Sequence, residues 1–287
     1  MHHQFRDLGE IDLELHLQEG AGLFVDNIEV RPYLMREIRQ YTYAHFMRNL
    51  QWISLSVDDF IKSVEDIEKR ITLQQEKSNL KPFDFYARLG GIELRETMLN
   101  ALSMILKTDD VRMLDENIVA VDFLKNGIYV ENEYGELVPN EERLEQLTEE
   151  DMKLVTRENF DQIVEIALIQ NYLKKPVDKT KELNPADEAT RSLMEQMDKM
   201  RKKVEEKKKK KAEAENGDDS QVTVATIISS VTAKSNSINK FNVWDLTLYS
   251  LYDEYARLEL IDNYDFSIRA MMAGAKDIDL KHWSSKI

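Results

Sequence analysis

The chain has no cysteine, few glycines and prolines, and no long apolar run. Without cysteine it can form no disulfide, thiolate nucleophile, zinc ribbon or iron–sulfur site. Nine glycines and five prolines among 287 residues leave little to interrupt helices, so long helices are expected. No apolar run approaches the roughly 18 residues of a membrane span, and the first residues lack the apolar core of a secretory signal. We therefore expect neither secretion nor a membrane association.

Charge is plentiful but unevenly distributed. The sequence has 39 basic and 54 acidic residues and a net charge of −15, which disfavours binding to nucleic acid over most of the molecule. Nine basic and two acidic side chains fall within residues 199–211. The lysine run at 207–211 has glutamates on both sides and no interleaved aromatic residue, so it fits a solvated helix face better than a nucleic-acid patch.

The residue patterns that usually carry chemistry are missing. The histidines have no partner at zinc-site spacing, and we expect His45, on an apolar helix face, to be a core residue. Paired aspartates fit helix caps or solvated loops, and no nucleophile elbow of the GxSxG type occurs. The sequence thus predicts no catalytic residue, no cofactor and no metal site. The five histidines are at positions 2, 3, 16, 45 and 282.

Two short stretches favour β-hairpins. Apolar residues alternate with polar ones over residues 10–17, the period of a half-buried strand, and a second strand is expected near 23–30. Gly20 and Gly22 between them suit a hairpin loop, whereas a phosphate-binding loop would need a further glycine opening a helix. Residues 127–139 predict a second hairpin that turns near Gly135.

The remainder of the N-terminal half predicts helices. Apolar residues recur every three or four positions after Pro32, after Ser56 as an expected cap, after Gly90-Gly91 and after Asn159 as another expected cap. The expected packing faces are Leu34, Ile38, Tyr41, His45 and Phe46; Phe60, Val64, Ile67 and Ile71; Leu94, Met98, Leu102 and Ile105; and Ile163, Ile166 and either Ile169 or Gln170.

Helical periodicity returns near the C-terminus. A short helix is expected with an inward face of Val224, Ile227, Ile228 and Val231. A longer helix follows, in which Trp244, Leu248, Leu251, Tyr255 and Leu258 recur at steps of four, three, four and three, the seam for another helix. A further short helix is expected to hold Met271 and Met272 and to stop at Gly274.

These patterns predict a mainly α-helical protein in three parts. Residues 1–176 form a helical N-terminal body with one or two small β-hairpins, and residues 222–287 form a small helical C-terminal module. Residues 177–221 between them have a helix-favouring but solvent-loving composition that cannot build a core, so this charged segment is a linker, an exposed helix, or both.

Four stretches together resemble a known family. Residues 28–60, 157–176, 224–260 and 268–287 are similar, in this order, to bacteriophage proteins encoded in the tail-morphogenesis regions of phages of Gram-positive hosts. Those proteins are often grouped with tail assembly chaperones or other virion-assembly proteins. The most specific stretch is NVWDLTLYSLYDEYARL followed by AGAKDIDLKHW, an aromatic-rich helix, a short gap and a closing tryptophan segment.

The resemblance implies a non-catalytic binding function. A tail assembly chaperone coats the tape-measure protein and helps recruit tail-tube subunits, so tape-measure and tail-tube proteins are the expected partners, with a homo-oligomer also open. By position, the resemblance assigns partner binding to the C-terminal module. The protein would act in the host cytoplasm during assembly, or alternatively remain in the virion tail or baseplate as a permanent component. The assigned residues are Trp244, Leu248, Tyr249, Tyr252 and Trp283.

Two other functional classes compete with this interpretation. An enzyme could gather carboxylates from distant segments, which would require a pocket in which at least two carboxylates have a raised pKa. A nucleic-acid binder would use the lysine-rich segment and show salt-sensitive affinity. The sequence favours the assembly protein over both. If the indole of Trp244 is core, Trp244→Ala is predicted to destabilise the C-terminal module by about 3–5 kcal/mol.

Overall fold

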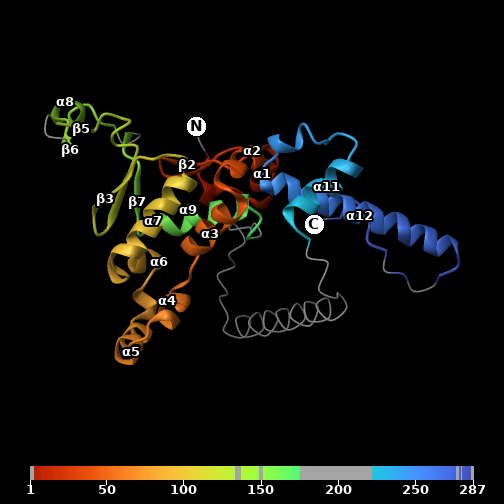
Figure 1. The fold of residues 1–287 in the computed structure, drawn as a ribbon, viewed down its shortest axis with the longest axis horizontal. Helices are drawn as coiled ribbons and strands as arrows, with labels where there is room; N and C mark the ends of the chain where they lie inside the picture. The colour runs from red at the N-terminus through yellow and green to blue at the C-terminus, as the bar shows by residue number, and fades with distance from the viewer. Residues whose placement is uncertain are drawn as a thin grey trace.

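The computed structural model describes residues 3–132, 137–148, 151–174, 222–275, 278 and 280–285. The predicted charged linker and both of its limits lie outside these residues, as do His2 and the predicted turn at Gly135. Helices dominate, with small antiparallel strand pairs, which confirms the predicted fold class. Figure 1 shows the hairpin β5–β6 at one end of the molecule and helix α12 projecting from the other.

The element bounds define this architecture. The N-terminal elements are η1 (Phe5–Asp7), α1 (Glu10–Glu19), β1 (Leu23–Val25), β2 (Ile28–Val30), α2 (Met35–Tyr41), α3 (Tyr43–Ile53), α4 (Val57–Ser63), α5 (Ile67–Gln75), η2 (Lys77–Asn79), α6 (Pro82–Asp84), η3 (Phe85–Leu89) and α7 (Gly91–Ile105). The later elements are β3 (Val111–Asp115), β4 (Ile118–Val121), β5 (Tyr129–Glu131), β6 (Leu137–Pro139), α8 (Glu141–Leu144), β7 (Leu154–Thr156), α9 (Phe160–Gln170), α11 (Val224–Lys234), η6 (Val243–Asp245) and α12 (Leu248–Met272).

The strand predicted over residues 10–17 is wrong, because this segment forms α1. Leu13 and Leu17 are buried one helical turn apart, whereas Ile11 and Leu15 are exposed. Gly20 ends the helix in the left-handed conformation, φ +74°. Its N–H donates to the Leu17 carbonyl, and the N–H of Ala21 donates to the His16 carbonyl. These are the two hydrogen bonds of a Schellman cap. The glycine therefore closes a helix and not a hairpin.

The first hairpin lies entirely within the second predicted strand. β1 and β2 pair antiparallel, with Leu23 opposite Val30 and Val25 opposite Ile28. All four of these side chains are buried, while the intervening positions are only half-buried. The two-residue connection places Asp26 at φ +52°, which an aspartate tolerates better than most residues.

Two of the predicted N-terminal helices are each broken in two. Thr42, at φ +62°, separates α2 from α3, and the expected core residue His45 is exposed and bonded to Asn49. Ser56 caps α4 as predicted, accepting from the Asp59 N–H. The chain then restarts as α5 with Asp66 as a second cap. This break turns Ile67 and Ile71 outward, so their predicted packing is wrong.

The central helices α7 and α9 follow the sequence closely. Met98, Leu102 and Ile105 of α7 are buried as predicted, and so is the expected face of α9. Asn159 precedes α9, but its side chain does not cap the helix. Its carbonyl oxygen instead accepts from the Thr156 N–H at 2.8 Å, which ties the helix to the strand before it.

Two small sheets complete the body. β4 lies between β3 and β7 in an antiparallel three-stranded sheet. The predicted hairpin near residues 127–139 is present as β5 and β6, with Tyr129 opposite Pro139. A separate small cluster of Ala120, Phe123 and Ile128 lies under this hairpin.

The main hydrophobic core joins the two ends of the chain. Phe46 of α3, Leu102 of α7 and Ile163 of α9 belong to the same buried cluster as Leu248 and Leu251 of α12. The backbone reinforces this contact, because the Met35 N–H donates to the Leu246 carbonyl at 2.8 Å. The first turn of α12 is therefore part of the body.

The C-terminal helices differ from the prediction at both ends. Trp244 lies in the separate turn η6 and not in the long helix. Met271 and Met272 do not form a short helix of their own, because α12 runs unbroken from Leu248 to Met272. Gly274 follows at φ +92°, as expected for a residue that ends a helix.

Candidate interaction surface

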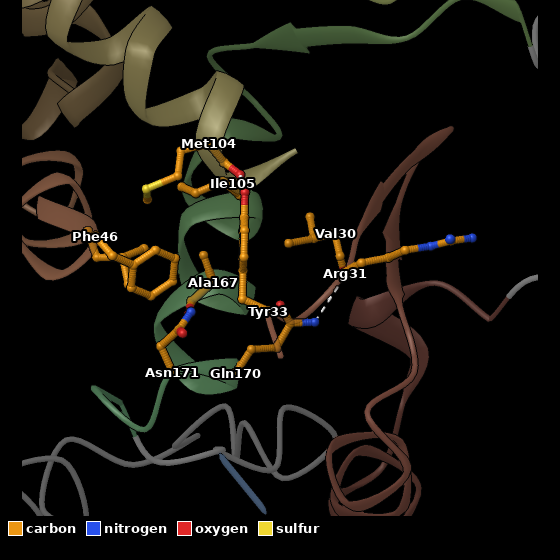
Figure 2. A pocket seen from close by; sticks show the side chains of 10 residues that line it. Val30, Arg31, Tyr33, Phe46, Met104, Ile105, Ala167, Gln170 and Asn171 are labelled. Atoms are coloured by element: carbon orange, nitrogen blue, oxygen red, sulfur yellow. Dashed lines mark hydrogen bonds between the residues drawn. The ribbon is translucent and has the colours of Figure 1, made fainter. Parts of the chain in front are cut away.

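One small cavity of the described body is a packing feature. It lies between β2, α3, α7 and α9, and its volume is about 10 Å³, enough for roughly one water molecule. Figure 2 shows Tyr33, Gln170 and Asn171 around it. Their polar groups bond to the backbone: the Tyr33 hydroxyl donates to the Met104 carbonyl at 2.5 Å, and the Gln170 amide donates to the Val30 carbonyl at 2.9 Å. No substrate larger than water fits here.

Two carboxylates of the body, those of half-buried Asp122 and buried Asp84, are held ionised by their neighbours. Burial alone would raise the pKa of Asp122, but hydrogen bonds from Thr108 and Lys153 outweigh it and leave the pKa below its usual value. Asp84 shows the same balance. Among the described residues, no group of three or more histidine or acidic side chains is placed to hold a metal ion.

Two of the five predicted partner-binding residues are buried. Leu248 and Tyr249 begin α12 and belong to the main core, with Leu248 only 1% exposed. The ring of Tyr249 lies 5.7 Å from that of Tyr172. A partner could reach these two side chains only if α12 left the body.

Tyr252 anchors α12 one turn further along. Its ring stacks on Tyr172 with 5.1 Å between centroids and an interplanar angle of 12°. On its other side it bonds to the Tyr43 hydroxyl, and burial together with this neighbour raises the pKa of Tyr43. Tyr252 therefore fixes the direction in which the helix leaves the body.

Trp244 is half-buried beside α2. Its indole N–H donates to the Lys240 carbonyl at 3.1 Å, and the guanidinium of Arg39 lies 5.8 Å from the ring centroid. An ion pair between Arg36 and Asp245 also joins α2 to η6. The indole thus packs against the edge of the core and is not enclosed by it.

Replacing Trp244 with alanine is expected to lower the free energy of unfolding by about 2 kcal/mol. This is less than the 3–5 kcal/mol for a fully buried tryptophan, because part of the indole already contacts water. Urea denaturation followed by circular dichroism measures the change. A loss above about 4 kcal/mol would mean that the indole is enclosed, and no loss would mean that it only rests on the surface.

Beyond the body, α12 continues into a projecting arm. We define the arm as the described residues from Glu259 to Ser285. Figure 1 shows this part of α12 extending past the other helices, with the chain after it turning back along the helix. Arg257 fastens the returning chain, donating to the carbonyl of Trp283 at 2.7 Å and to that of Ser285 at 2.9 Å. The ring of His282 lies 5.4 Å from Tyr264, in an edge-on contact.

The arm carries a concentration of exposed apolar side chains. Trp283, 47% exposed, is the one predicted binding residue that lies on it. Phe266, which the sequence did not single out, is 74% exposed, and Met272 is 85% exposed. The sequence does contain a signal for this exposure. After Leu258 the residues at the same heptad spacing change from apolar to charged, which indicates that the helix leaves the core there. The arm also exposes Met271 and Leu280.

Comparison with known proteins places the arm within a family-matched region. Residues 207–287 match the family model of the YomV second domain. That family is phage-derived, of the Bacillus phage SPbeta-like kind. The matched YomV-like region contains α11, η6, α12 and the returning tail. The match supports a phage protein and says nothing about tail morphogenesis. Searches of curated proteins and of solved structures gave no match to the chain.

The described part of the chain contains no candidate for a membrane-spanning helix. None of the described helices combines the length and the apolar character that a bilayer crossing needs. The longest, α12, carries charged residues along its length.

Proposed function

We propose that this protein is a non-catalytic assembly factor of phage tail morphogenesis, which binds tape-measure or tail-tube proteins in the host cytoplasm through its arm. The YomV-like region supports the phage setting. The binding function is inferred from the exposed Trp283, which lies on the returning tail and is held by Arg257 against the helix that projects from the body. Neither a cofactor nor nucleic acid is required for this activity.

The fastening of the tail makes Trp283 suitable for recognition. Arg257 binds the main-chain carbonyl of Trp283 and leaves the indole side chain half-exposed. An exposed tryptophan held at a fixed backbone position loses little conformational entropy on binding, and tryptophan is enriched among residues that dominate interface energies. A client with an apolar pocket or an amphipathic helix is the expected partner.

Trp283→Ser is expected to weaken capture of the client by at least about tenfold, because hot-spot tryptophans contribute about 2 kcal/mol or more. The measurement is the dissociation constant for the purified tape-measure or tail-tube protein of the phage that encodes this chain. Phe241→Ser is the control, since Phe241 is also aromatic and is even more exposed, at 91%, but lies before η6 and outside the arm. Equal binding by both variants and the native chain would contradict the proposal.

Mass spectrometry of mature particles separates the two forms of this function. An assembly factor is absent from finished virions, whereas a permanent tail or baseplate component is present in a fixed ratio to the other tail proteins. A fixed ratio would replace the assembly factor with the structural component. If the protein neither binds a tail protein nor occurs in virions, both forms fail.

A further inference from the structure

The packing seam of α12 continues past the point where the protein covers it. Within the body the seam consists of Leu248, Leu251, Tyr255 and Leu258, at steps of three, four and three, and all four pack in or against the core. The same alternation of steps continues through Asp262, Asp265, Arg269 and Met272. These four positions are exposed. We call this exposed continuation, with three charged side chains and one methionine, the uncovered seam; such a face can pair with another helix through complementary charges.

Helix α11 packs on α12 only as far as Asp262. α11 packs along α12, and Ser235 at its end bonds to Glu254 at 3.0 Å. Lys234, the last residue of α11, forms an ion pair with Asp262. Among the described helices and strands, α1, α9 and α11 make the main contacts with α12, and the returning tail contacts it at Tyr264 through His282.

The uncovered seam combines apolar and charged groups of both signs. Phe266 lies next to it at 74% exposure, and Met272 ends it at 85% exposure. Asp265 and Arg269 have no ion-pair partner within the described part of the chain. An exposed aromatic residue between an unpaired anion and an unpaired cation, one turn apart, is a self-complementary arrangement.

We propose that the uncovered seam binds the same seam of a second copy, with the two α12 helices antiparallel. In this arrangement the two-fold axis passes near Ser267. Asp265 then faces the partner's Arg269, and the symmetric contact forms at the same time. The two Phe266 side chains meet beside the axis. Isologous two-fold contacts of this kind repeat every favourable pair twice.

Charge selects this orientation and this occupant. A parallel pair would set Asp262 against its own equivalent, and likewise Asp265 and Arg269, and like charges in facing positions are destabilising. The antiparallel pair replaces these repulsions with two reciprocal ion pairs. Met272 then lies opposite the partner's Asp262, next to Lys234 with its aliphatic stem. The contact uses Phe266 and the charged residues of α12, whereas the proposed client contact is assigned to Trp283 on the returning tail, so Phe266→Ser and Trp283→Ser test the two proposals separately.

The interface is short. Eleven residues of α12 from Asp262 to Met272 span about 16 Å of helix. Contacts of this size fall at the small end of specific interfaces, which are typical of weak and reversible association. We therefore expect a dimer that dissociates on dilution.

Sedimentation velocity of the full chain over a concentration series tests the proposal. The native chain is expected to shift from monomer to dimer, and Phe266→Ser is expected to raise the dissociation constant at least about tenfold, equivalent to about 1.4 kcal/mol. Phe241→Ser, which removes a still more exposed phenylalanine outside α12, is expected to leave the constant unchanged.

A charge exchange tests the register. Asp265→Arg and Arg269→Asp are each expected to weaken the dimer, because each places like charges opposite one another, and the double variant is expected to restore it. Circular dichroism controls for loss of helix, since Arg269 also lies in the last turn of α12. A monomer at every concentration up to the solubility limit overturns the proposal. So does a dimer that is indifferent to Phe266 and to both charges.

Discussion

Replacing Leu248 with alanine is expected to lower the free energy of unfolding of the whole chain by about 2–5 kcal/mol. The side chain is 1% exposed and belongs to the core that also contains Phe46 and Ile163. Removing its branched end leaves a cavity that the surrounding helices cannot fully close. Because α12 and the N-terminal helices share this core, urea should unfold both in one cooperative transition, which shifts as a whole in the variant.

Leu15→Ala is the matched control for this prediction. Leu15 is also a helical leucine, but it lies on the exposed face of α1, so its loss should change stability by less than about 0.5 kcal/mol. Circular dichroism and tryptophan fluorescence should give coincident curves for all three proteins. Two separate transitions, of which only one responds to Leu248→Ala, would mean that the C-terminal module folds independently of the body.

Asp84→Asn is expected to lower the free energy of unfolding by about 3 kcal/mol at neutral pH. Asp84 is 1% exposed and accepts hydrogen bonds from the Lys81 N–H at 2.8 Å, Arg88 at 2.7 Å and Arg157 at 3.0 Å. It thereby joins α6 to the segment that precedes α9. Removing its charge leaves two guanidinium groups without their carboxylate, which costs about 3–5 kcal/mol when the pair is fully buried. Both arginines keep some water contact, so the lower end applies.

The effect of Asp84→Asn should depend on pH in a defined direction. Burial raises the pKa of Asp84, but the Lys81 N–H and Arg157 outweigh it, so the pKa in the folded protein is below the ordinary value of about 3.9. Such a group contributes its stability above the unfolded pKa and loses it as the pH falls through the folded pKa. The difference between the native chain and the variant should therefore be full at pH 7 and shrink below about pH 4.

Asp58→Asn provides the comparison for this pH series. Asp58 pairs with Lys77 at 2.7 Å, but both side chains are largely exposed, and surface pairs of this kind contribute less than about 1 kcal/mol. The measurement is the urea midpoint of both variants between about pH 3 and pH 8, a range that covers most of the titration of ordinary carboxylates. A loss for Asp84→Asn no larger than that for Asp58→Asn would contradict the assigned ion-pair network.

Helical periodicity allowed the central helices to be predicted, but α1 and the broken helices were not. In α1 the apolar residues at 11, 13, 15 and 17 alternate as in a strand, but in the helix they divide between two faces, and the core receives only one of these faces. Only Leu13 and Leu17 reach it, and that is a property of the packed body. The break at Thr42 likewise requires a threonine at positive φ, which no local propensity favours because threonine is β-branched.

The sequence predicted where the candidate surface lies, but not which of its residues are buried in the body and which are exposed to a partner. The aromatic residues of the C-terminal region point to contacts, yet periodicity cannot distinguish a contact within the chain from one with a partner. Leu248 and Tyr249 face the body, whereas Trp283 faces outward because Arg257 turns the tail back on the helix. Which residues are buried and which are exposed depends on the packing of the whole protein, which local periodicity does not contain.

The fastening by Arg257 has a consequence for how this protein can diversify. The guanidinium grips two main-chain oxygens, at positions 283 and 285, and is therefore indifferent to which side chains those positions carry. Under the proposed function, substitutions there would alter the preferred client while the anchorage stays the same. Adaptation to a changed client would then need few mutations, and none of them would have to disturb the folded body.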